Sequence, residues 1–242
     1  MRMIKLNIKI KTVLITGASK GIGLGIVKAL LEDTLENYRI ILIARNSEIY
    51  DDEVNKLRIK YKKNKIIKLV CDLAKSKDLD NCLKEILNYK FKIDILVNNA
   101  GYTNPQGLLD IDVDDFRHTL EVNVISPFKI IQELFKVGNH PSHIINLGST
   151  SGSGARPGWL TYAASKASMI SMSDTLREEL NIFGTTVICI SPGRCATNLR
   201  KILAPDEDPS TIMQPENVAN VVKFLISREG KYITSQNLII RQ

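Results

Sequence analysis

The stretch that decides the fold is TVLITGASKGIG, residues 12–23. Its first five residues are apolar or β-branched and predict a buried strand, and the glycines that follow predict a turn into a helix. Gly17 permits the tight turn, while Gly21 and Gly23 let a phosphate approach the backbone and the helix approach the sheet. The N–H groups that open the helix favour an anion. The spacing is GxxxGxG rather than GxGxxG, so a plain glycine-rich turn remains an alternative.

Short β-branched runs alternate with longer amphipathic runs along the rest of the chain. The strands are apolar throughout, which is typical of a parallel sheet covered on both sides. No linker or repeat divides the sequence, so we expect one Rossmann-type catalytic domain over residues 1–242, an α/β doubly wound parallel sheet of about seven strands with helices on both faces. The expected strands are 12–16, 39–44, 65–70, 92–97, 142–148, 185–191 and 237–241. The expected helices follow the glycine turn, begin near 48, and span about 77–88, 113–136 with an interruption at Pro127, 161–182 and 216–227.

The charge balance of the 242 residues is basic, with a formal net charge of +7. Its densest cluster, KYKKNK at 60–65, closes a polar helix and lacks the aromatic or arginine-rich pattern of a nucleic-acid site. We therefore expect no nucleic-acid partner and attribute the charge to attraction of small anions.

The cysteines and the N-terminus bear on location. Cys71, Cys82, Cys189 and Cys195 form no CxxC or metal spacing, as expected of reduced thiols. The opening stretch MRMIKLNIKIKTVLIT lacks the unbroken apolar run of a signal peptide, and no apolar run approaches the ~18 residues of a membrane span. We expect a cytoplasmic protein that does not enter the membrane.

The end of the second predicted strand indicates the cofactor. A site for NAD usually places Asp or Glu there to bind the ribose 2′-hydroxyl. This sequence reads ILIARNSE, residues 41–48, with no acid before Glu48. Arg45 is placed to pair with a 2′-phosphate, and Lys20 in the glycine turn adds a second cation. This favours NADP(H) over NAD(H), with solvated surface cations as the alternative.

The segment WLTYAASKAS, residues 159–168, places Tyr162 and Lys166 four residues apart. On a helix the two side chains share one face. A neighbouring cation favours the phenolate, so we expect Lys166 to lower the pKa of Tyr162 and make it an acid or base. A surface tyrosine beside a surface lysine is the alternative.

Seven segments occur in one order along nearly the whole chain. They are TGASKGIG (16–23), CDL (71–73), NNAG (98–101), EVNVISP (121–127), LGSTSG (147–152), YAASK (162–166) and SPGRCAT (191–197). In these segments the chain resembles the short-chain dehydrogenase/reductase family, which implies an NADP-dependent enzyme acting on CH–OH or C=O groups. A redox-inactive nucleotide sensor or scaffold on the same fold is the non-enzyme alternative.

The resemblance implies four catalytic residues. Tyr162 is similar to the family's proton donor, and Lys166 to the cation that lowers its pKa and holds the nicotinamide ribose. Ser149 would hydrogen-bond the substrate carbonyl oxygen, or else only cap the following turn. Asn123 resembles the residue that kinks its helix and holds a water leading to Lys166.

The resemblance also implies cofactor contacts. Asp72 would lie near the adenine of the cofactor and Asn99 near the adenosine ribose. Thr197 would lie near the carboxamide of the nicotinamide. Asn98 is interpreted as a strand-bridging residue and Cys195 as a packing thiol beside the cofactor. The full set expected to bind the cofactor is Gly17, Ser19, Lys20, Gly21, Ile22, Gly23, Arg45, Asp72, Leu73, Asn99, Ala100, Gly101, Tyr162, Lys166, Pro192, Gly193, Cys195 and Thr197. No metal is expected, and His118, His140 and His143 receive no role.

The substrate is a small carbonyl compound whose identity stays open. Arg156, Arg194 and Arg200 lie near the predicted substrate mouth, and an arginine cluster suits a phosphate or carboxylate. This favours an anionic sugar phosphate as the substrate. The chain also resembles short family members such as polysaccharide-synthesis or pentulose-phosphate reductases, although this likeness is weaker than the match to the family. A 3-oxoacyl-carrier-protein reductase is the alternative. The segment between Thr197 and Pro215 is shorter than in members that take bulky substrates.

Assembly is expected through the helix that carries Tyr162. Its small residues would let a second helix approach, and Met169, Ile170 and Met172 would add apolar area. The family commonly pairs this helix about a two-fold axis, so we expect a homodimer or a homotetramer. The sequence ends at NLIIRQ without the common DGG extension, which puts one interface contact in doubt and favours the dimer.

Overall fold

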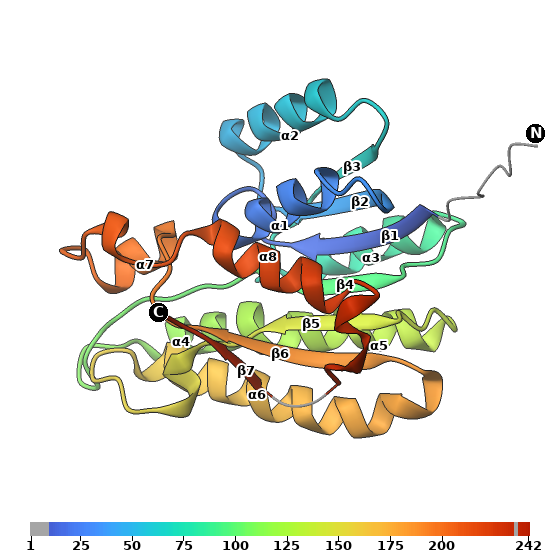
Figure 1. Cartoon of the computed structure of the whole chain (residues 1–242). Coiled ribbons are helices and arrows are strands. Elements are labelled where there is room, and N and C mark those ends of the chain that lie inside the picture. The colour runs from blue at the N-terminus through green and yellow to red at the C-terminus, as the bar shows by residue number, and fades with distance from the viewer. Residues whose placement is uncertain (1–9, 235–236) are drawn as a thin grey trace, which may run out of the picture.

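A single sheet of seven parallel strands forms the centre of the computed structural model, which describes residues 10–234 and 237–242 (Figure 1). The strand order is β3-β2-β1-β4-β5-β6-β7, so the direction of winding reverses between β1 and β4. This confirms the predicted fold class. Residues 1–9 of the opening stretch lie outside the described residues. The strands are β1 (Ile10–Thr16), β2 (Asn37–Ala44), β3 (Lys65–Val70), β4 (Ile95–Asn98), β5 (His143–Leu147), β6 (Thr186–Pro192) and β7 (Asn237–Ile240).

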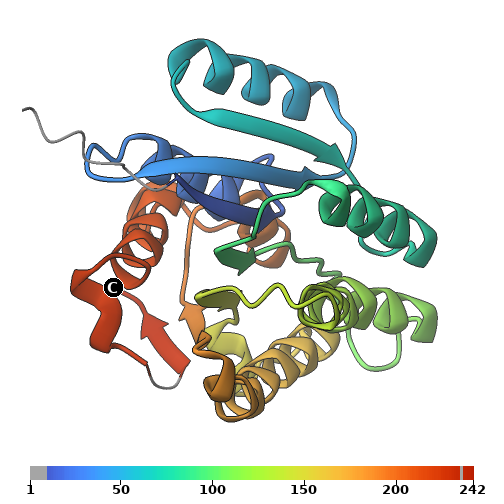
Figure 2. The same ribbon diagram turned by 90° about the vertical axis from the view of Figure 1, so that its right-hand side faces the viewer.

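Apolar side chains leave the central strands on both faces, as the continuous apolar runs predict. In β1, Val13 and Ile15 pack into one core cluster, while Leu14 packs into the other. The first cluster joins the sheet to α1 (Gly21–Leu31), α2 (Glu48–Lys60) and α8 (Pro215–Leu225). The second joins it to α3 (Ser76–Asn88), α5 (Ser126–Lys136) and α6 (Leu160–Leu180). Figure 2 shows these helices as two layers on either side of the strands.

The predicted elements are all present, with shifts at their ends. β4 begins at Ile95 rather than 92. The regular strand pairing does not extend back past Asp94, because Asp94 makes irregular contacts with the two neighbouring strands. Its carboxylate accepts a hydrogen bond from the Thr12 N–H (2.8 Å), and its carbonyl accepts one from the Ser142 N–H (2.8 Å). One aspartate thereby ties the beginnings of three strands together.

The helix expected over 113–136 is continuous but changes its winding before Pro127. It consists of α4 (Val113–Leu120), one π-helical turn, η1 (Glu121–Ile125), and α5. Proline has no N–H to bond the carbonyl four residues earlier, which belongs to Asn123, and its ring crowds that carbonyl. The wider π turn relieves the clash. The predicted kink at Asn123 therefore has its cause in Pro127.

Short helices complete the fold between and after the main elements. They are η2 (Thr150–Ser153), η3 (Asn181–Phe183), α7 (Asn198–Leu203), η4 (Pro209–Thr211) and η5 (Glu229–Tyr232). Among the helices of the described part of the chain, none has both the length and the apolarity needed to span a bilayer.

The turn between β1 and α1 leaves no room for a side chain at Gly23. A Cβ atom there would lie 2.3 Å from the Gly17 carbonyl oxygen and 2.5 Å from Nδ2 of Asn99. Both neighbours are fixed, so Gly23→Ala should lower the free energy of unfolding by about 2 kcal/mol or more. Urea unfolding measures this change. Gly154→Ala is the control, because its Cβ would meet only Arg156 Nη1, at 3.8 Å. Equal stability of the two variants would contradict the close approach.

Candidate active site

The carboxyl ends of the strands open into a cavity of about 680 Å³ at the point where the strand order reverses. Ligands bind at this switch point in open α/β sheets, and the volume suits a sizeable ligand. Every site residue predicted from the sequence lines the cavity except Gly23 and Asn123. Gly23 lies behind the glycine turn. Asn123 lies behind Gly101, whose Cβ would be 3.8 Å from the Asn123 Oδ1 atom and 3.9 Å from Lys166 Nζ.

The glycine turn presents the N-terminus of α1 to the cavity. The cap residue Lys20 makes no side-chain cap bond, and the first turn of α1 contains no acid. Its N–H groups and positive dipole end are therefore available to an anion. Asn99 holds the turn in place by donating from Nδ2 to the carbonyls of Thr16 (2.9 Å) and Gly17 (3.1 Å). Asn99 thus buttresses the turn in addition to lining the cavity.

Lys20 and Arg45 line one end of the cavity as exposed side chains. Neither has a hydrogen bond or ion pair to another side chain within residues 10–234 and 237–242. Arg45 lies close enough to Tyr102 to oppose the rise in the pKa of that phenol, which the hydrogen bond to Asp115 and burial raise to about 12. Asp72 has a local role, since its Oδ1 atom accepts from the Ala74 N–H (3.2 Å).

Tyr162 and Lys166 are buried together on α6, at the other end of the cavity. Burial raises the pKa of Tyr162 to about 12, and the Ser149 hydroxyl and the Arg200 charge oppose this only in part. Burial lowers the pKa of Lys166 to about 8. Burial therefore dominates the pKa of Tyr162 in this geometry, and Lys166 is not among the groups that oppose it. The ammonium lies 5.8 Å from the ring centre and donates instead to the Leu147 carbonyl (2.6 Å).

Ser149 follows β5 and lines the cavity with Tyr162. Its hydroxyl accepts a hydrogen bond from the Ser151 N–H (3.1 Å), so it caps the following turn as the alternative interpretation held. The two roles are compatible, because a hydroxyl that accepts one bond still has a proton to donate.

Asn123 is buried behind the cavity floor and fixes the segment after β4. Its side chain accepts from the Tyr102 N–H (2.7 Å) and donates to the Tyr102 carbonyl (2.9 Å) and to the Ser165 hydroxyl (2.9 Å). It therefore links the strand end to α6. Asn98 donates to Asn146 Oδ1 (2.9 Å) in the next strand, so it bridges strands as predicted.

The segment after β6 borders the same end of the cavity. Thr197 caps α7, since its hydroxyl accepts from the Arg200 N–H (3.1 Å). Cys195 is buried in the first core cluster, where burial raises the pKa of its thiol to about 11, so it is a packing residue at the cavity wall.

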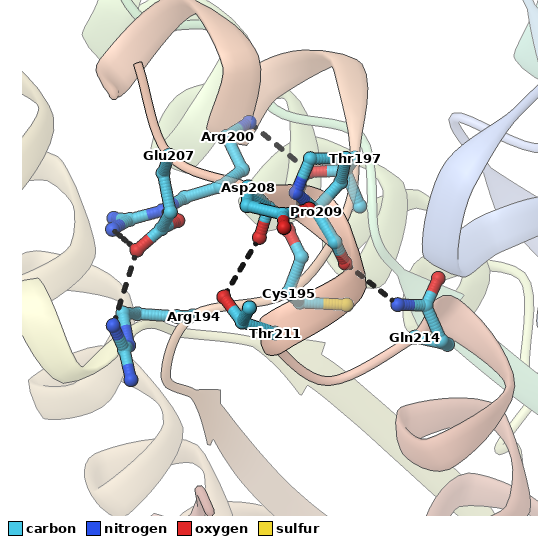
Figure 3. Close-up of polar contacts among 9 residues, drawn as sticks. All are labelled: Arg194, Cys195, Thr197, Arg200, Glu207, Asp208, Pro209, Thr211 and Gln214. Atoms are coloured by element: carbon cyan, nitrogen blue, oxygen red, sulfur yellow. Dashed lines mark hydrogen bonds and ion pairs between the residues drawn. The ribbon is translucent and has the colours of Figure 1, made fainter. Parts of the chain in front are cut away.

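The three arginines at the substrate mouth are not a free cationic cluster, which corrects the sequence-based expectation. Glu207 pairs with Arg200 through two contacts, Nε to Oε2 (2.6 Å) and Nη2 to Oε1 (2.8 Å), and with Arg194 through Nη1 (3.3 Å; Figure 3). Arg156 is exposed and donates to the neighbouring Ala155 carbonyl. The carboxylate between two of the guanidinium groups offsets much of their attraction for an anion.

Sequence analysis missed three residues of this region. Trp159 lines the cavity, and its position three residues before Tyr162 on one helix face is the signal that could have found it. Tyr102 and His118 meet edge to face in the cavity wall, with their ring centres 4.4 Å apart. No sequence signal pairs these two, because the contact depends on how the segment after β4 meets α4 in the folded chain.

A family model described as short chain dehydrogenase matches residues 11–208. The chain belongs to the short-chain dehydrogenase family. The resemblance seen in the sequence is thereby confirmed, and as a short-chain dehydrogenase the protein is an oxidoreductase.

Curated and solved proteins similar to this short-chain dehydrogenase match it along almost its whole length. The 3-oxoacyl-(acyl-carrier-protein) reductase of Rickettsia bellii is 32% identical over 238 residues, 94% of each chain. A blue fluorescent protein from a metagenomic library, solved with NADPH, has a TM-score of 0.83 at 26% identity, covering 95% of this chain and 96% of that chain. A short chain dehydrogenase from Burkholderia cenocepacia, solved with NADP, has a TM-score of 0.82 at 28% identity with the same coverage.

Burial of Lys166 should cost stability at neutral pH, so Lys166→Met should raise the free energy of unfolding. The pKa of Lys166 in the folded protein, about 8, lies below its ordinary value of 10.5. The unfolded chain therefore binds more protons between these values, and stability rises with pH across this window. Below pH 8, burial of the Lys166 charge lowers the free energy of unfolding of the wild type by about 3 kcal/mol. Lys166→Met removes this cost but also loses the hydrogen bond to Leu147, which cancels about 1–2 kcal/mol of the stability gained.

We expect Lys166→Met to be more stable than the wild type by about 1 kcal/mol at pH 7 in urea unfolding, and the gain to vanish by about pH 10. A difference that stays constant between these pH values would contradict the assigned pKa.

Proposed function

We propose that this short-chain dehydrogenase reduces a ketone to a secondary alcohol with NADPH, and that Tyr162 donates the proton. One observation carries the proposal: the buried pair Tyr162 and Lys166 and the exposed cations Lys20 and Arg45 line one cavity, on either side of the point where the strand order reverses. We propose that residues 1–242 act as one catalytic domain. The four cysteines described are buried and unpaired, which suits the cytoplasm.

The residues present fit an NADP(H) molecule. The open N-terminus of α1 would hold the pyrophosphate, and Arg45 with Lys20 would pair with the 2′-phosphate. The cavity is large enough to hold both this cofactor's reactive end and a small substrate. When bound, NADPH supplies the hydride that reduces the ketone carbon.

The chain's own groups handle the oxygen of the ketone. Ser149 donates a hydrogen bond to that oxygen, where negative charge develops. Tyr162, whose pKa burial raises to about 12, carries its proton at neutral pH, and it can transfer that proton to the developing alkoxide because the alkoxide is a stronger base than the phenolate. Lys166 remains mainly cationic at pH 7 and stabilises the phenolate left behind. Asn123 fixes the position of α6 through Ser165.

For the substrate we favour a 3-oxoacyl thioester over a sugar phosphate. The relatives at 30–33% identity are named 3-oxoacyl-(acyl-carrier-protein) reductases. The ion pairs to Glu207 also weaken the case for a strong phosphate site at Arg194 and Arg200. The sugar phosphate remains the competing assignment.

The test of the function is NADPH oxidation with an acetoacetyl thioester and a set of ketose phosphates. We expect turnover with the thioester and loss of about two or more powers of ten in Tyr162→Phe, which keeps the ring and removes the proton. NADPH affinity should hardly change in this variant. Near-normal turnover in Tyr162→Phe would remove this residue from the mechanism. Tight NADPH binding without turnover of any ketone would favour a nucleotide sensor.

Arg45 should decide the choice of cofactor. Arg45→Asp should weaken NADPH binding by about 2 kcal/mol or more, because it replaces a charge-assisted pair with a repulsion. NADH binding should change far less. Titration of wild type and variant with both cofactors measures this difference, and equal affinity of the wild type for NADPH and NADH would refute the assignment.

We also propose that the enzyme assembles about a two-fold axis through α5 and α6. Ala167, Ser168 and Ser171 are exposed along α6, and Ile125 and Phe128 are exposed near the start of α5. Apolar side chains beside small ones suit close helix packing. The expected contribution of Met169 is wrong, since Met169 is buried and Met172 packs against the second core cluster. The apolar area comes from α5 instead.

Sedimentation at micromolar concentration should show a dimer or tetramer. Phe128→Arg should shift it toward monomer, because a charge would enter an apolar contact. Leu35→Arg is the control, since Leu35 is 83% exposed, in the turn before β2. A fully active wild-type monomer would overturn the proposed interface.

A further inference from the structure

The guanidinium of Arg200 is held in one orientation at the cavity wall. Its Nε and Nη2 atoms make a two-point contact with the carboxylate of Glu207. The Trp159 ring centre lies 5.5 Å from its Cζ atom. Its Nη1 atom has no hydrogen-bond partner among residues 10–234 and 237–242. Arg200 therefore has one edge engaged and keeps free donors on the other.

A hydrogen-bonded turn begins at the residue that follows Glu207 in the chain. Asp208 accepts from the N–H and the hydroxyl of Ser210, both at 2.8 Å, and its carbonyl accepts from the Thr211 hydroxyl (2.9 Å). Gln214 then donates to the Pro209 carbonyl (2.9 Å; Figure 3). The turn constrains the backbone next to Glu207, so the ion pair is a preorganised part of the cavity wall.

The charges are distributed unequally between the mouth and the wall. The Arg194 side chain is 61% exposed, whereas those of Arg200 and Glu207 are 18% and 16% exposed. Hydrogen bonds from Arg200 and the charge of both arginines hold the pKa of Glu207 below its usual range, so the carboxylate stays ionised at neutral pH. The inner pair is therefore neutral as a unit, and the excess positive charge lies at the mouth.

A neutral pair with free donors recognises a neutral oxygen better than an anion. The attraction of Arg200 for an anion is offset by Glu207, because the carboxylate of Glu207 neutralises the guanidinium and repels the anion. A carbonyl oxygen accepts an N–H from the free edge without that repulsion. Arg200 lines the same cavity as the Tyr162 phenol, so a substrate that reaches Tyr162 can also meet Arg200.

We propose that Arg200, oriented and neutralised by Glu207, is the specificity-determining donor for a neutral second oxygen of the substrate, such as the ester or thioester carbonyl of a 3-oxo compound. Glu207 thereby disfavours ketones whose second group is a carboxylate or phosphate. This inference rests on the proposed function, because it places a ketone at Tyr162.

Trp159 makes the test direct, since it is the chain's only tryptophan and faces Arg200. The enzyme is saturated with NADP⁺, which cannot reduce a ketone, and titrated with methyl acetoacetate or with acetoacetate while Trp159 fluorescence is recorded. These probes have nearly the same shape and differ in charge. The wild type should bind the neutral ester more tightly than the anion.

Glu207→Gln should free the charge of Arg200 and tighten acetoacetate binding about tenfold, while ester binding stays within about threefold. Asp206→Asn is the matched control: it removes an exposed charge next to Glu207 and should change neither affinity. Arg200→Met should weaken ester binding about tenfold, and this result does not depend on how Glu207→Gln folds.

Tighter wild-type binding of acetoacetate than of the ester, an equal shift of both probes in Glu207→Gln, or no saturable binding of the ester would overturn the proposal. Because the titration involves no turnover, its failure is distinct from a failure of the reductase assay. A normal reductase with the wrong probe preference removes only the role of Arg200 and Glu207.

Discussion

The site depends on one close approach, between the turn after β1 and the end of β4. The Asn99 amide bonds two carbonyls of that turn, and the Thr16 hydroxyl accepts from the N–H groups of Asn99 and Ala100, both at 3.1 Å. These bonds close the point where the sheet reverses its winding. The N-terminus of α1 and the strand ends then face a common space, so the cation end and the phenol end share one cavity.

A lysine buried for chemistry sets the electrostatics of that space. Lys166 is held by a backbone carbonyl rather than by a carboxylate, so its charge remains available to a neighbouring phenolate. This arrangement has a stability cost, as expected where a charge is removed from water without a counter-ion. Functional sites commonly retain such costs, and the two well-packed core clusters offset this one.

Much of this arrangement was predictable because it follows from local pattern. The apolar runs gave the strands, and the parallel sheet brought their carboxyl ends together with the predicted cofactor residues. Longer-range effects were not predictable. The Glu207 pairs cross an irregular loop interrupted by Pro205, so no periodicity relates that carboxylate to Arg200. The pKa of Tyr162 depends on burial, which the spacing of Tyr162 and Lys166 does not contain.

The strand pairing has a consequence for how the protein is made. β4 has four residues, yet Val13 of β1 pairs with Ile95, and the Thr16–Asn99 bonds span 83 positions. As the chain leaves the ribosome, β1, β2 and β3 can pair before β4 exists, since their contacts are comparatively local. During that interval one long edge of β1 has no partner, and such an edge can pair with another chain. When residues 95–99 emerge, β4 pairs with the free edge of β1, and Asn99 bonds the glycine turn at the same time.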